Sequence, residues 1–546
     1  MIKQLKVRYL IACANLILLC FCAHNSVNAQ RFKGNAKWGD KGDGTYVNPV
    51  LPADYSDIDA IRVGDDYYAI SSTMQFSPGM VVLHSKDLVN WEIIGHVVDD
   101  LSRISSNLNW DRMNCYGRGI WAGSIRYYKN KFWVYFGTPD DGFFMSCAAN
   151  PAGPWGPLHQ LWKVKGWDDC CSFCDDDGQL YFIATNFGFD PKTDKKYNVH
   201  LFKMTNDGRS LIMESDSIIH QSNGSEANKL YKINGLYYHC FSEVKPEGRV
   251  IMMERSKNIY GPWEIRQLNH VSKLLDREPN QGGLVSTPTG KWYFLTHHGS
   301  GDWEGRPASL LPVNWINGWP IIGNVGVDGI GNMVWTGRKP ISYKRKLYIQ
   351  TSDEFSTSRL GVQWEWNYQP RPDKWSLIEH KGFLRLYAFM PIHSNNNKKD
   401  IILRAGNTIT QRSMRTSSNV ATVKIDITHM ADGQFAGVTH FSTNTNSLFG
   451  IRQENGIRTL VYDDNGEEIL GARVDSHFVW LQSIWDANGT SHYSFSTDNK
   501  FFQVFGSSYQ LTWGDYRGDR IGIFNFNSQR DKGYVDIDWF RYDYKK

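Results

Sequence analysis

The sequence has few cysteines, little net charge and no long hydrophobic run after its N-terminal leader. Its 546 residues include 9 cysteines, three of which (Cys13, Cys20 and Cys22) lie in the N-terminal leader described below. The remaining cysteines are too few for a disulfide scaffold of this size. Lys and Arg total 60 against 56 Asp and Glu, and a net charge of +4 is too small to indicate a nucleic-acid partner or an anionic membrane surface. We therefore expect a neutral partner.

Aromatic residues and glycine are abundant instead. Aromatic residues make up 14% of the chain, with 21 Trp, 27 Tyr and 28 Phe, and there are 49 Gly. This composition favours many short strands and tight turns over long helices, and it excludes disordered, collagen-like and coiled-coil proteins. Aromatic faces also stack on the C–H faces of sugar rings, so the composition suits a carbohydrate ligand.

Residues 1–29 are typical of a secretory signal peptide. Basic residues at positions 3, 6 and 8 precede an apolar run over 9–23, and a polar stretch follows that ends at Ala29. The run is shorter than the roughly 20 residues that a membrane-spanning helix needs, and no later segment is long enough either. We expect an exported protein, periplasmic or extracellular, without a membrane span. Lipid attachment at Cys20 or Cys22 is the less favoured alternative, because both follow large residues.

An aromatic hairpin recurs five times between residues 48 and 322. Each copy has a polar turn with Gly or Asn and then two or three aromatic residues, and the copies are 49 to 65 residues apart. This period is typical of four-stranded propeller blades with unequal loops. We predict an all-β fold with a five-bladed β-propeller over residues 30–340, in which the hairpin aromatics pack between blades. These anchors are Tyr67, Phe132, Tyr181, Tyr237 and Trp292.

The pattern changes after about residue 340. Alternating strand-like segments such as 383–389, 421–427 and 535–542 dominate residues 341–546, and no long helix is evident. Their length and alternation predict a C-terminal β-sandwich of the jelly-roll, concanavalin-like type. The polar segment 395–399 is predicted to be an exposed loop tip.

Three groups of acidic residues precede hairpins at a similar distance. Asp57 and Asp59 lie before the first hairpin, Asp168 and Asp169 lie before the third, and Glu226 lies before the fourth. A single acid of this kind is more often a surface or turn residue. Equivalent positions in successive blades, however, lie around one axis. The shared position within the repeat therefore predicts that the three groups meet at one site.

The cluster Cys170, Cys171 and Cys174 invites a zinc hypothesis. It has no second pair of Cys or His at ligand spacing nearby. A buried strand with small residues is therefore the favoured interpretation.

The motifs around the acids resemble glycoside hydrolase family 43. The residues that carry the resemblance are the N-P-V-L-P opening at 48–52, the acidic pair 168–169 before D-D-D-G at 175–178, and E-A-N-K-L-Y at 226–231. The resemblance covers essentially the whole mature chain, including a C-terminal β-sandwich. It implies an exo-acting glycosidase that removes β-D-xylosyl or α-L-arabinofuranosyl units from plant oligosaccharides or polysaccharides, with no required cofactor.

Carried over by position, the resemblance implies three catalytic roles. Asp57 is the general base, with Asp59 as the alternative. Asp169, with Asp168 as its alternative, orients the proton donor and raises its pKa, and Glu226 is the proton donor. By resemblance the mechanism is inverting, which requires an ionised and a protonated carboxyl group about 6.5–9.5 Å apart.

The resemblance also implies residues that bind the sugar. Arg306 is expected to bind substrate hydroxyls, and Trp121 and Phe76 are expected at the pocket walls. Met74 stands where relatives commonly have Phe, so we expect an altered pocket floor. Arg520 aligns with a phenylalanine that the sandwich of related enzymes lends to the pocket, which predicts a more polar mouth.

Calcium binding stays open from the sequence. Many relatives have a histidine near the propeller axis, sometimes with a bound cation, at the position where this chain has Gln281. In the sandwich, Asp353, Glu354 and Asp538 are acids that can serve as oxygen ligands, although acids at strand ends are usually only solvated.

Other functions fit the same sequence less well. Met74 and Arg520 slightly favour arabinofuranosidase over xylosidase activity. An endo-arabinanase or a galactan-directed hydrolase of the same family is an alternative. A non-catalytic glycan-binding propeller is another, but it would be expected to have lost one of the three acids.

Overall fold

A computed structural model of the protein describes residues 38–189, 196–222, 224–271, 279–298, 301–345, 347–392 and 398–545. The predicted signal peptide with its three cysteines and most of the predicted loop tip at 395–399 lie outside the described residues. In the part that is described, no helix is long and apolar enough to cross a membrane.

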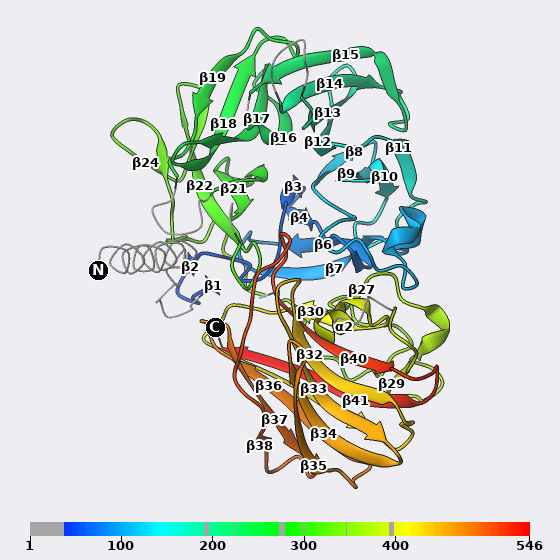
Figure 1. Cartoon of the computed structure of the whole chain (residues 1–546). Coiled ribbons are helices and arrows are strands. Elements are labelled where there is room, and N and C mark those ends of the chain that lie inside the picture. Colours follow the sequence, from blue (N-terminus) through cyan, green and yellow to red (C-terminus); the bar gives the residue numbers. More distant parts are fainter. Residues whose placement is uncertain are drawn as a thin grey trace, which may run out of the picture. The chain divides into compact units, whose positions relative to one another are not determined.

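Five four-stranded antiparallel sheets follow one another along the chain (Figure 1), and in each the strands pair in chain order. The first is β3 (Asp59–Val63), β4 (Asp66–Ser71), β6 (Gly79–Ser85) and β7 (Trp91–Val98). The second is β8 (Gly123–Tyr128), β9 (Lys131–Thr138), β10 (Gly142–Ala148) and β11 (His159–Trp162). The third is β12 (Trp167–Cys174), β13 (Leu180–Asn186), β14 (Asn198–Met204) and β15 (Leu211–Gln221). The fourth is β16 (Glu226–Ile233), β17 (Leu236–Lys245), β18 (Gly248–Ser256) and β19 (Glu264–Gln267). The fifth is β20 (Gly282–Ser286), β21 (Trp292–His297), β22 (Ala308–Ile316) and β23 (Trp319–Ile322).

The first strands of the five sheets surround a common centre. Strand β3 contacts β8 and β20, and β12 contacts β8 and β16. The backbone N–H of Leu284 on β20 donates to the Tyr231 hydroxyl on β16 at 3.1 Å, which joins the fourth sheet to the fifth. The five repeated hairpins of the sequence form the first and second strands of the blades. The predicted five-bladed propeller is therefore confirmed.

A small sheet ties the two ends of the propeller together. It consists of β1 (Gly39–Asp40), β2 (Thr45–Val47) and β26 (Thr336–Arg338). Next to it, Asn48 Nδ2 donates to the backbone oxygens of Leu310 at 2.9 Å and Val334 at 2.7 Å. A separate two-stranded sheet pairs β24 (Asn324–Val325) with β25 (Gly331–Asn332).

The C-terminal region consists of two large antiparallel sheets, as the predicted β-sandwich requires, and apolar side chains fill its core. One sheet runs β35 (Glu467–Arg473), β34 (Ile457–Asp464), β33 (Asn446–Glu454), β32 (Gln434–Phe441), β40 (Arg520–Asn527), β30 (Ile409–Arg412), β27 (Glu365–Asn367) and β5 (Phe76–Ser77). The other runs β28 (Trp375–Ser376), β29 (Leu384–Tyr387), β41 (Tyr534–Lys545), β31 (Ser418–Asp426), β36 (Phe478–Trp485), β37 (Thr490–Ser496) and β38 (Gln503–Val504), with β39 (Tyr509–Gln510) also on β37. Short helical turns are η1 (Leu101–Arg103), η2 (Ser106–Leu108), η3 (Pro372–Lys374), η4 (Lys398–Asp400) and α2 (Ile401–Arg404).

The propeller and the sandwich share a sheet and buried ion pairs. Strand β5 belongs by sequence to the first blade but pairs with β27 of the sandwich. Glu365 on β27 is fully buried and pairs with Arg412 at 2.9 Å and Arg520 at 2.8 Å. Although burial alone would raise the pKa of Glu365, the two guanidinium groups hold that pKa well below its usual range. Across the contact, Arg517 Nη2 of the sandwich lies 2.6 Å from Asp54 Oδ2 of the propeller, so the contact between the two regions is ionic as well as apolar.

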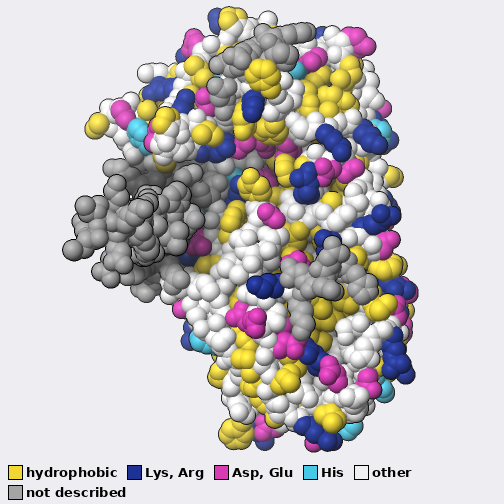
Figure 2. Space-filling model, in the orientation of Figure 1, with side chains coloured by type: hydrophobic (Ala, Val, Ile, Leu, Met, Phe, Trp, Pro, Cys, Tyr) yellow, Lys and Arg dark blue, Asp and Glu magenta, His cyan; other side chains and the backbone are white. Residues whose placement is uncertain are grey.

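Charged side chains of both signs are interspersed over the face of the molecule that Figure 2 shows. This distribution agrees with the small net charge of +4.

Candidate active site

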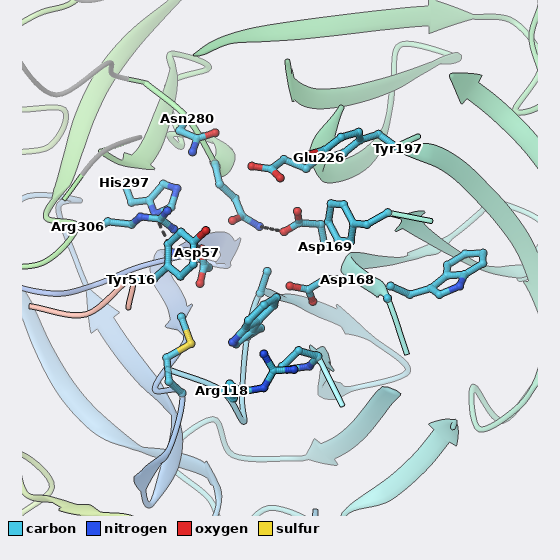
Figure 3. Close-up of a pocket in the computed structure, with 18 of the residues that line it drawn as sticks. Asp57, Arg118, Asp168, Asp169, Tyr197, Glu226, Asn280, His297, Arg306 and Tyr516 are labelled. Carbon is cyan, nitrogen blue, oxygen red and sulfur yellow. Dashed lines mark hydrogen bonds and ion pairs between the residues drawn. The ribbon is translucent and has the colours of Figure 1, made fainter. Parts of the chain in front are cut away.

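A pocket of about 800 Å³ lies where the first strands of all five blades begin. Each blade contributes to its lining, through Asp57, Ala122, Asp169, Glu226 and Gln281 in chain order. Figure 3 shows Asp57 and Arg306 on one side of the pocket, and Glu226, Asp169 and Asp168 on the other. The structure thus brings together the acidic groups that the sequence placed at one phase of the repeat.

The acids point into the pocket because their strands are bulged. Between Asp168 and Cys171, β12 contains one residue more than the paired segment of β13. Strand β16 has the same irregularity between Glu226 and Lys229, relative to β17. A bulge leaves a residue unpaired and turns side chains out of the regular alternation, and bulges are frequent beside active sites.

The bulges have a left-handed backbone conformation at equivalent positions. Asp57, Asp169 and Ala227 have φ values of 54°, 55° and 66°. This conformation costs a residue with a side chain roughly 1–2 kcal/mol, so the surrounding hydrogen bonds must maintain it. Asp57 and Asp169 occupy the same position in this motif, and Glu226 stands one residue earlier. Its longer side chain can compensate for that difference.

Asp57 is surrounded by hydrogen-bond donors. The Ser72 hydroxyl donates to Asp57 Oδ2 at 2.6 Å, and Arg306 Nη1 lies 3.4 Å from Oδ1. The backbone N–H of Asp57 donates to His297 Nδ1 at 2.9 Å, so this imidazole accepts at Nδ1 and is neutral. Burial and the charge of Arg306 lower the pKa of His297 well below its usual value, in agreement with that arrangement. The site thus surrounds the Asp57 carboxyl group with donors and places it next to a neutral histidine.

Glu226 is in a different environment. Burial raises its pKa, and the charge of Asp57 adds to this effect, while Arg249 and Arg306 oppose it. Arg249 Nη1 on β18 lies 2.7 Å from Glu226 Oε1. Glu226, with its raised pKa, therefore lies across the pocket from Asp57, which is surrounded by donors.

Asp169 and Asp168 are two further carboxyl groups in the pocket near Glu226. Burial, together with the charges of Glu226 and Asp57, raises the pKa of Asp169 to about 7. Gln281 Nε2 donates to Asp169 Oδ1 at 3.3 Å. Burial, followed by the charge of Asp169, raises the pKa of Asp168 well above its usual value. Asp168 needs the space that Gly137 leaves, because a side chain there would collide with Asp168 Oδ1.

The predicted pocket walls are present in part. Trp121 and Met74 line the pocket, and the Trp121 indole donates to the Gly117 backbone oxygen at 2.9 Å. Arg306 also lines it, and its guanidinium carbon lies 5.0 Å from the centre of the Tyr516 ring of the sandwich. One aromatic residue of the sandwich therefore reaches the pocket.

Phe76 does not line the pocket. It lies on β5, which pairs with β27, and its side chain is fully buried. Its ring lies 4.0 Å from the guanidinium carbon of Arg520. The expected wall position is corrected, because sheet pairing with the sandwich draws this segment into the contact between the two regions.

Arg520 does not form the pocket mouth either. It begins β40, is fully buried and is bound to Glu365. Pairing of β40 with β30 and β32 holds it inside, whereas the loop before β40 carries Tyr516 to the pocket. The polar mouth expected from Arg520 is therefore corrected to an aromatic side chain four residues earlier.

The alternative general base, Asp59, is fully buried away from the pocket lining. Its Oδ2 accepts from Arg126 Nη1 at 2.7 Å and from the backbone N–H of Ile125 at 3.0 Å. These contacts tie the first blade to the second, so the structure gives Asp59 a structural place.

Several pocket residues were missed from the sequence. Trp167 stands directly before Asp168, so its position in the repeat was a usable signal. Arg249 lies late in a blade, and nothing in its sequence surroundings marked it. The missed residues that line the pocket are Ala122, Arg118, Pro139, Asp140, Lys165, Gly166, Trp167, Phe187, Tyr197, Arg249, Asn280 and Tyr516.

The residues considered for metal binding have other partners. Gln281 presents an amide donor to Asp169, which is not the arrangement of a metal ligand. In the sandwich, Glu354 pairs with Arg541 at 2.8 Å and Asp538 pairs with Lys424 at 2.6 Å. The three neighbouring cysteines are free thiols on β12. Among the described residues, no three His, Cys, Asp or Glu side chains are grouped so that they could hold a metal ion.

Comparison with protein families matches both regions. Residues 46–320 match the model described as glycosyl hydrolases family 43. Residues 352–543 match the model described as beta xylosidase C-terminal concanavalin A-like domain.

Individual relatives agree with these matches. The chain is 34% identical to a beta-xylosidase of Formosa agariphila, with 98% of each chain covered. It is 30% identical to a non-reducing end alpha-L-arabinofuranosidase of Bacteroides ovatus, with 66% of this chain and 68% of that one covered. Among solved structures, a GH43 protein of Bacillus licheniformis superimposes with a TM-score of 0.78 at 26% identity, covering 92% of this chain and all of the other (100%).

Proposed function

The chain belongs to glycosyl hydrolase family 43 and is a glycosidase of the xylosidase and arabinofuranosidase type; from this premise we propose that it is an exported, exo-acting and inverting enzyme. It removes terminal β-D-xylosyl or α-L-arabinofuranosyl units from oligosaccharides of plant hemicellulose or pectin. The observation that carries the proposal is the pairing of Asp57, surrounded by donors, with Glu226, whose pKa is raised, across one pocket.

The proposed reaction is a single displacement. Asp57 accepts a proton from a water molecule while the water oxygen bonds to the anomeric carbon. The glycosidic C–O bond breaks, and Glu226 gives its proton to the leaving oxygen. An ionised base and a protonated acid on opposite sides of the bond are what inversion requires.

Asp169 supports the acid in this scheme. When Asp169 is ionised, its negative charge beside Glu226 disfavours a second charge there and so helps to keep Glu226 protonated. Arg306 pairs with Asp57 and lines the same pocket, so its guanidinium can hold substrate hydroxyls close to the attacking water.

The proposal of exo action is supported by the position of Tyr516. This residue of the sandwich lies beside Arg306 in the pocket lining, where a second domain would hinder the passage of a long polysaccharide. For the sugar, Met74 in the lining favours the arabinofuranosyl unit, whereas the 34% identity to a beta-xylosidase favours the xylosyl unit. Export rests on residues 1–29, which have the pattern of a signal peptide.

An activity screen tests the proposal. The purified protein is incubated with 4-nitrophenyl α-L-arabinofuranoside and β-D-xyloside, and then with arabino- and xylo-oligosaccharides. We expect nitrophenol from at least one aryl glycoside and single sugar units from the chain ends. Proton NMR of the first product should show the inverted anomer. No release from any substrate, together with binding to xylan or arabinan, would contradict the proposal.

A further inference from the structure

Behind the strand that begins with Glu226, one buried carboxylate is held between two histidines. Glu254 on β18 is 5% exposed. Its Oε1 lies 2.7 Å from His220 Nδ1 on β15, and its Oε2 lies 3.0 Å from His239 Nδ1 on β17. The carboxylate therefore joins the last strand of the third blade to the fourth blade.

The far nitrogens of the two rings reach the residues on either side of Glu226. His220 Nε2 lies 2.9 Å from the Ser225 hydroxyl, one residue before Glu226. His239 Nε2 lies 2.9 Å from Asn228 Oδ1, two residues after it. Both flanks of Glu226 are thus bound to a single carboxylate through one imidazole each.

Asn228 extends the network to Asp169. It is fully buried in the bulge of β16, and its Nδ2 donates to the Asp169 backbone oxygen at 3.0 Å and to Thr185 Oγ1 at 2.8 Å. Because a backbone oxygen can only accept, the amide has one orientation, and His239 Nε2 carries the proton that Asn228 Oδ1 accepts. The same network therefore holds the two bulges that present Asp169 and Glu226.

Because His239 Nε2 holds a proton, His239 donates to Glu254 from Nδ1 only when the ring carries a positive charge; burial lowers the pKa of His239, and the hydrogen bond and the charge of Glu254 oppose that shift. In this donating arrangement Glu254 is the ionised partner. Burial alone would raise its pKa, but the hydrogen bonds from His220 and His239 lower it to about 2. A buried carboxylate that is fully hydrogen-bonded makes a rigid network, and removing one of its members leaves polar groups without partners.

We propose that Glu254 is a positioning residue for the proton donor: through His220 and His239 it holds Ser225 and Asn228, and so keeps Glu226 beside Asp169. The inference rests on the proposed function, because Glu226 is the proton donor only in that reaction. Glu254 itself does not touch the substrate, since it does not line the pocket.

Burial is the largest cause of the raised pKa of Glu226, and it sets the sign of the expected pH effect. The charged groups that face Glu226 are Arg249 on β18, Arg306 before β22, Asp57 before β3, and Asp168 and Asp169 on β12. If the strand loosens, Glu226 gains solvent, so its pKa falls towards the ordinary value. The acid then loses its proton at lower pH, and the alkaline limb of the kcat/KM profile moves down.

Glu254→Gln tests the proposal, with Glu92→Gln as the matched control. Glu92 on β7 also binds a histidine, with its Oε1 3.0 Å from His84 Nδ1 on β6, but neither residue lines the pocket. We expect Glu254→Gln to lower kcat on oligosaccharides by up to about 10²-fold, the cost of misplacing a reacting group by about 1 Å. Loss on an activated aryl glycoside should be smaller, and KM should change little.

Hydrogen exchange gives a second readout that does not depend on turnover. In Glu254→Gln, peptides covering residues 225–230 should take up deuterium faster than in the wild type, and in Glu92→Gln they should not. Should Glu254→Gln fail to fold, Ser225→Ala removes the His220 link, together with the contact between the Ser225 and Ser222 hydroxyls, and leaves the His239–Asn228 link in place. It should show the same changes, but smaller ones.

The outcomes separate this inference from the proposed function. Unchanged exchange, alkaline limb and leaving-group ratio in Glu254→Gln would overturn the positioning role. A wild-type protein that cleaves none of the substrates would overturn the proposed function, while faster exchange at 225–230 would still support the network as the structure that holds Glu226.

Discussion

The two sides of the pocket are held by different parts of the molecule. On the side of Asp57, the sandwich supplies the support. Arg517, fully buried, pairs with Asp54 Oδ2 at 2.6 Å, and its Nη1 lies 3.4 Å from the Ser72 backbone oxygen. Ser72 in turn donates to Asp57. The Arg517 guanidinium of the sandwich therefore contacts both Asp54 and Ser72, the residue that hydrogen-bonds the proposed base.

On the side of Glu226, the support comes from within the propeller. Glu254, its two histidines and Asn228 all belong to the third and fourth blades. The comparison shows that the sandwich supports the pocket on the side of Asp57, whereas the described support of Glu226 comes from the propeller. Damage to the contact between the regions should therefore affect Asp57 first, whereas damage within the fourth blade should affect Glu226 first.

The largest effects are expected from the reacting acids themselves. Asp57→Asn should lose activity by about 10²–10⁴-fold on every substrate, because the water attacks in each case and Asp57 is the proposed base that takes its proton. Glu226→Gln should lose as much on oligosaccharides but less on aryl glycosides, whose leaving groups need little protonation. Rates on both substrate types give the ratio.

Asp59→Asn is the control for Asp57→Asn. Because Asp59 binds Arg126 inside the fold, its replacement should lower the unfolding temperature more than the activity of the folded fraction. Inactivation by Asp59→Asn with an active Asp57→Asn would show that the roles are assigned to the wrong residue.

Arg517→Met should break the support that the sandwich gives to the Asp57 side. It leaves Asp54 buried without its ion pair, a loss of about 3–5 kcal/mol in unfolding free energy. The folded variant should be slower on activated and unactivated substrates alike, because the base acts on both.

Arg385→Met provides the comparison for Arg517→Met. It removes a paired arginine elsewhere in the sandwich, where Arg385 Nε lies 2.8 Å from Asp536 Oδ1. Thermal unfolding should show destabilisation in both variants, and assays well below the unfolding temperature should show slower turnover only in Arg517→Met. Equal turnover in the two variants would show that Arg517 of the sandwich does not support the active site.

On the side of Glu226, the repulsion between Asp169 and the neighbouring carboxyl groups should appear in the pH dependence of protein stability. The pKa of Asp169 is about 7 in the folded state, above its ordinary value of 3.8, so folded protein holds this proton more tightly than unfolded protein does. The stability contributed by that proton is therefore lost as pH rises from about 4 to about 7. Asp169→Asn lacks this term, so its unfolding temperature relative to wild type should increase over that window and level off above it. A difference independent of pH, measured by thermal unfolding at several pH values, would contradict this.

The smallest effect is expected from Tyr516→Ala. The ring lies 5.0 Å from the Arg306 guanidinium and is 54% exposed. An exposed contact of this kind contributes about 0.5–1 kcal/mol, so KM should rise by roughly two- to five-fold with little change in kcat. Tyr127→Ala, an exposed aromatic residue that does not line this pocket, should leave KM unchanged. A fall in kcat instead would indicate that Tyr516 positions the reacting groups.

Much of the fold and part of the site could be predicted because they repeat. The aromatic hairpins recur once per blade, and a period of this kind requires only local sequence to be recognised. Asp57, Asp169 and Glu226 were found through the same period, and the structure places all three in one pocket. Their catalytic roles stay predictions until the variants are measured.

Residues at the contact between the two regions could not be predicted in this way. Phe76 and Arg520 stood at plausible positions in the chain, but β5 and β40 are built into one sheet that buries both. Arg249 and Tyr516 were missed for a different reason, since each reaches the pocket from a segment distant from any acidic motif.

The sequence by itself determined the all-β class, the number of blades, the sandwich and the three acids, because periodic patterns and local motifs follow from short-range geometry. The tertiary structure alone decided which side chains face the pocket and which lie in the contact between propeller and sandwich. It also decided how each acid is held, since a bulge, a buried guanidinium or a pair of histidines acts through distances between segments that lie far apart in the chain.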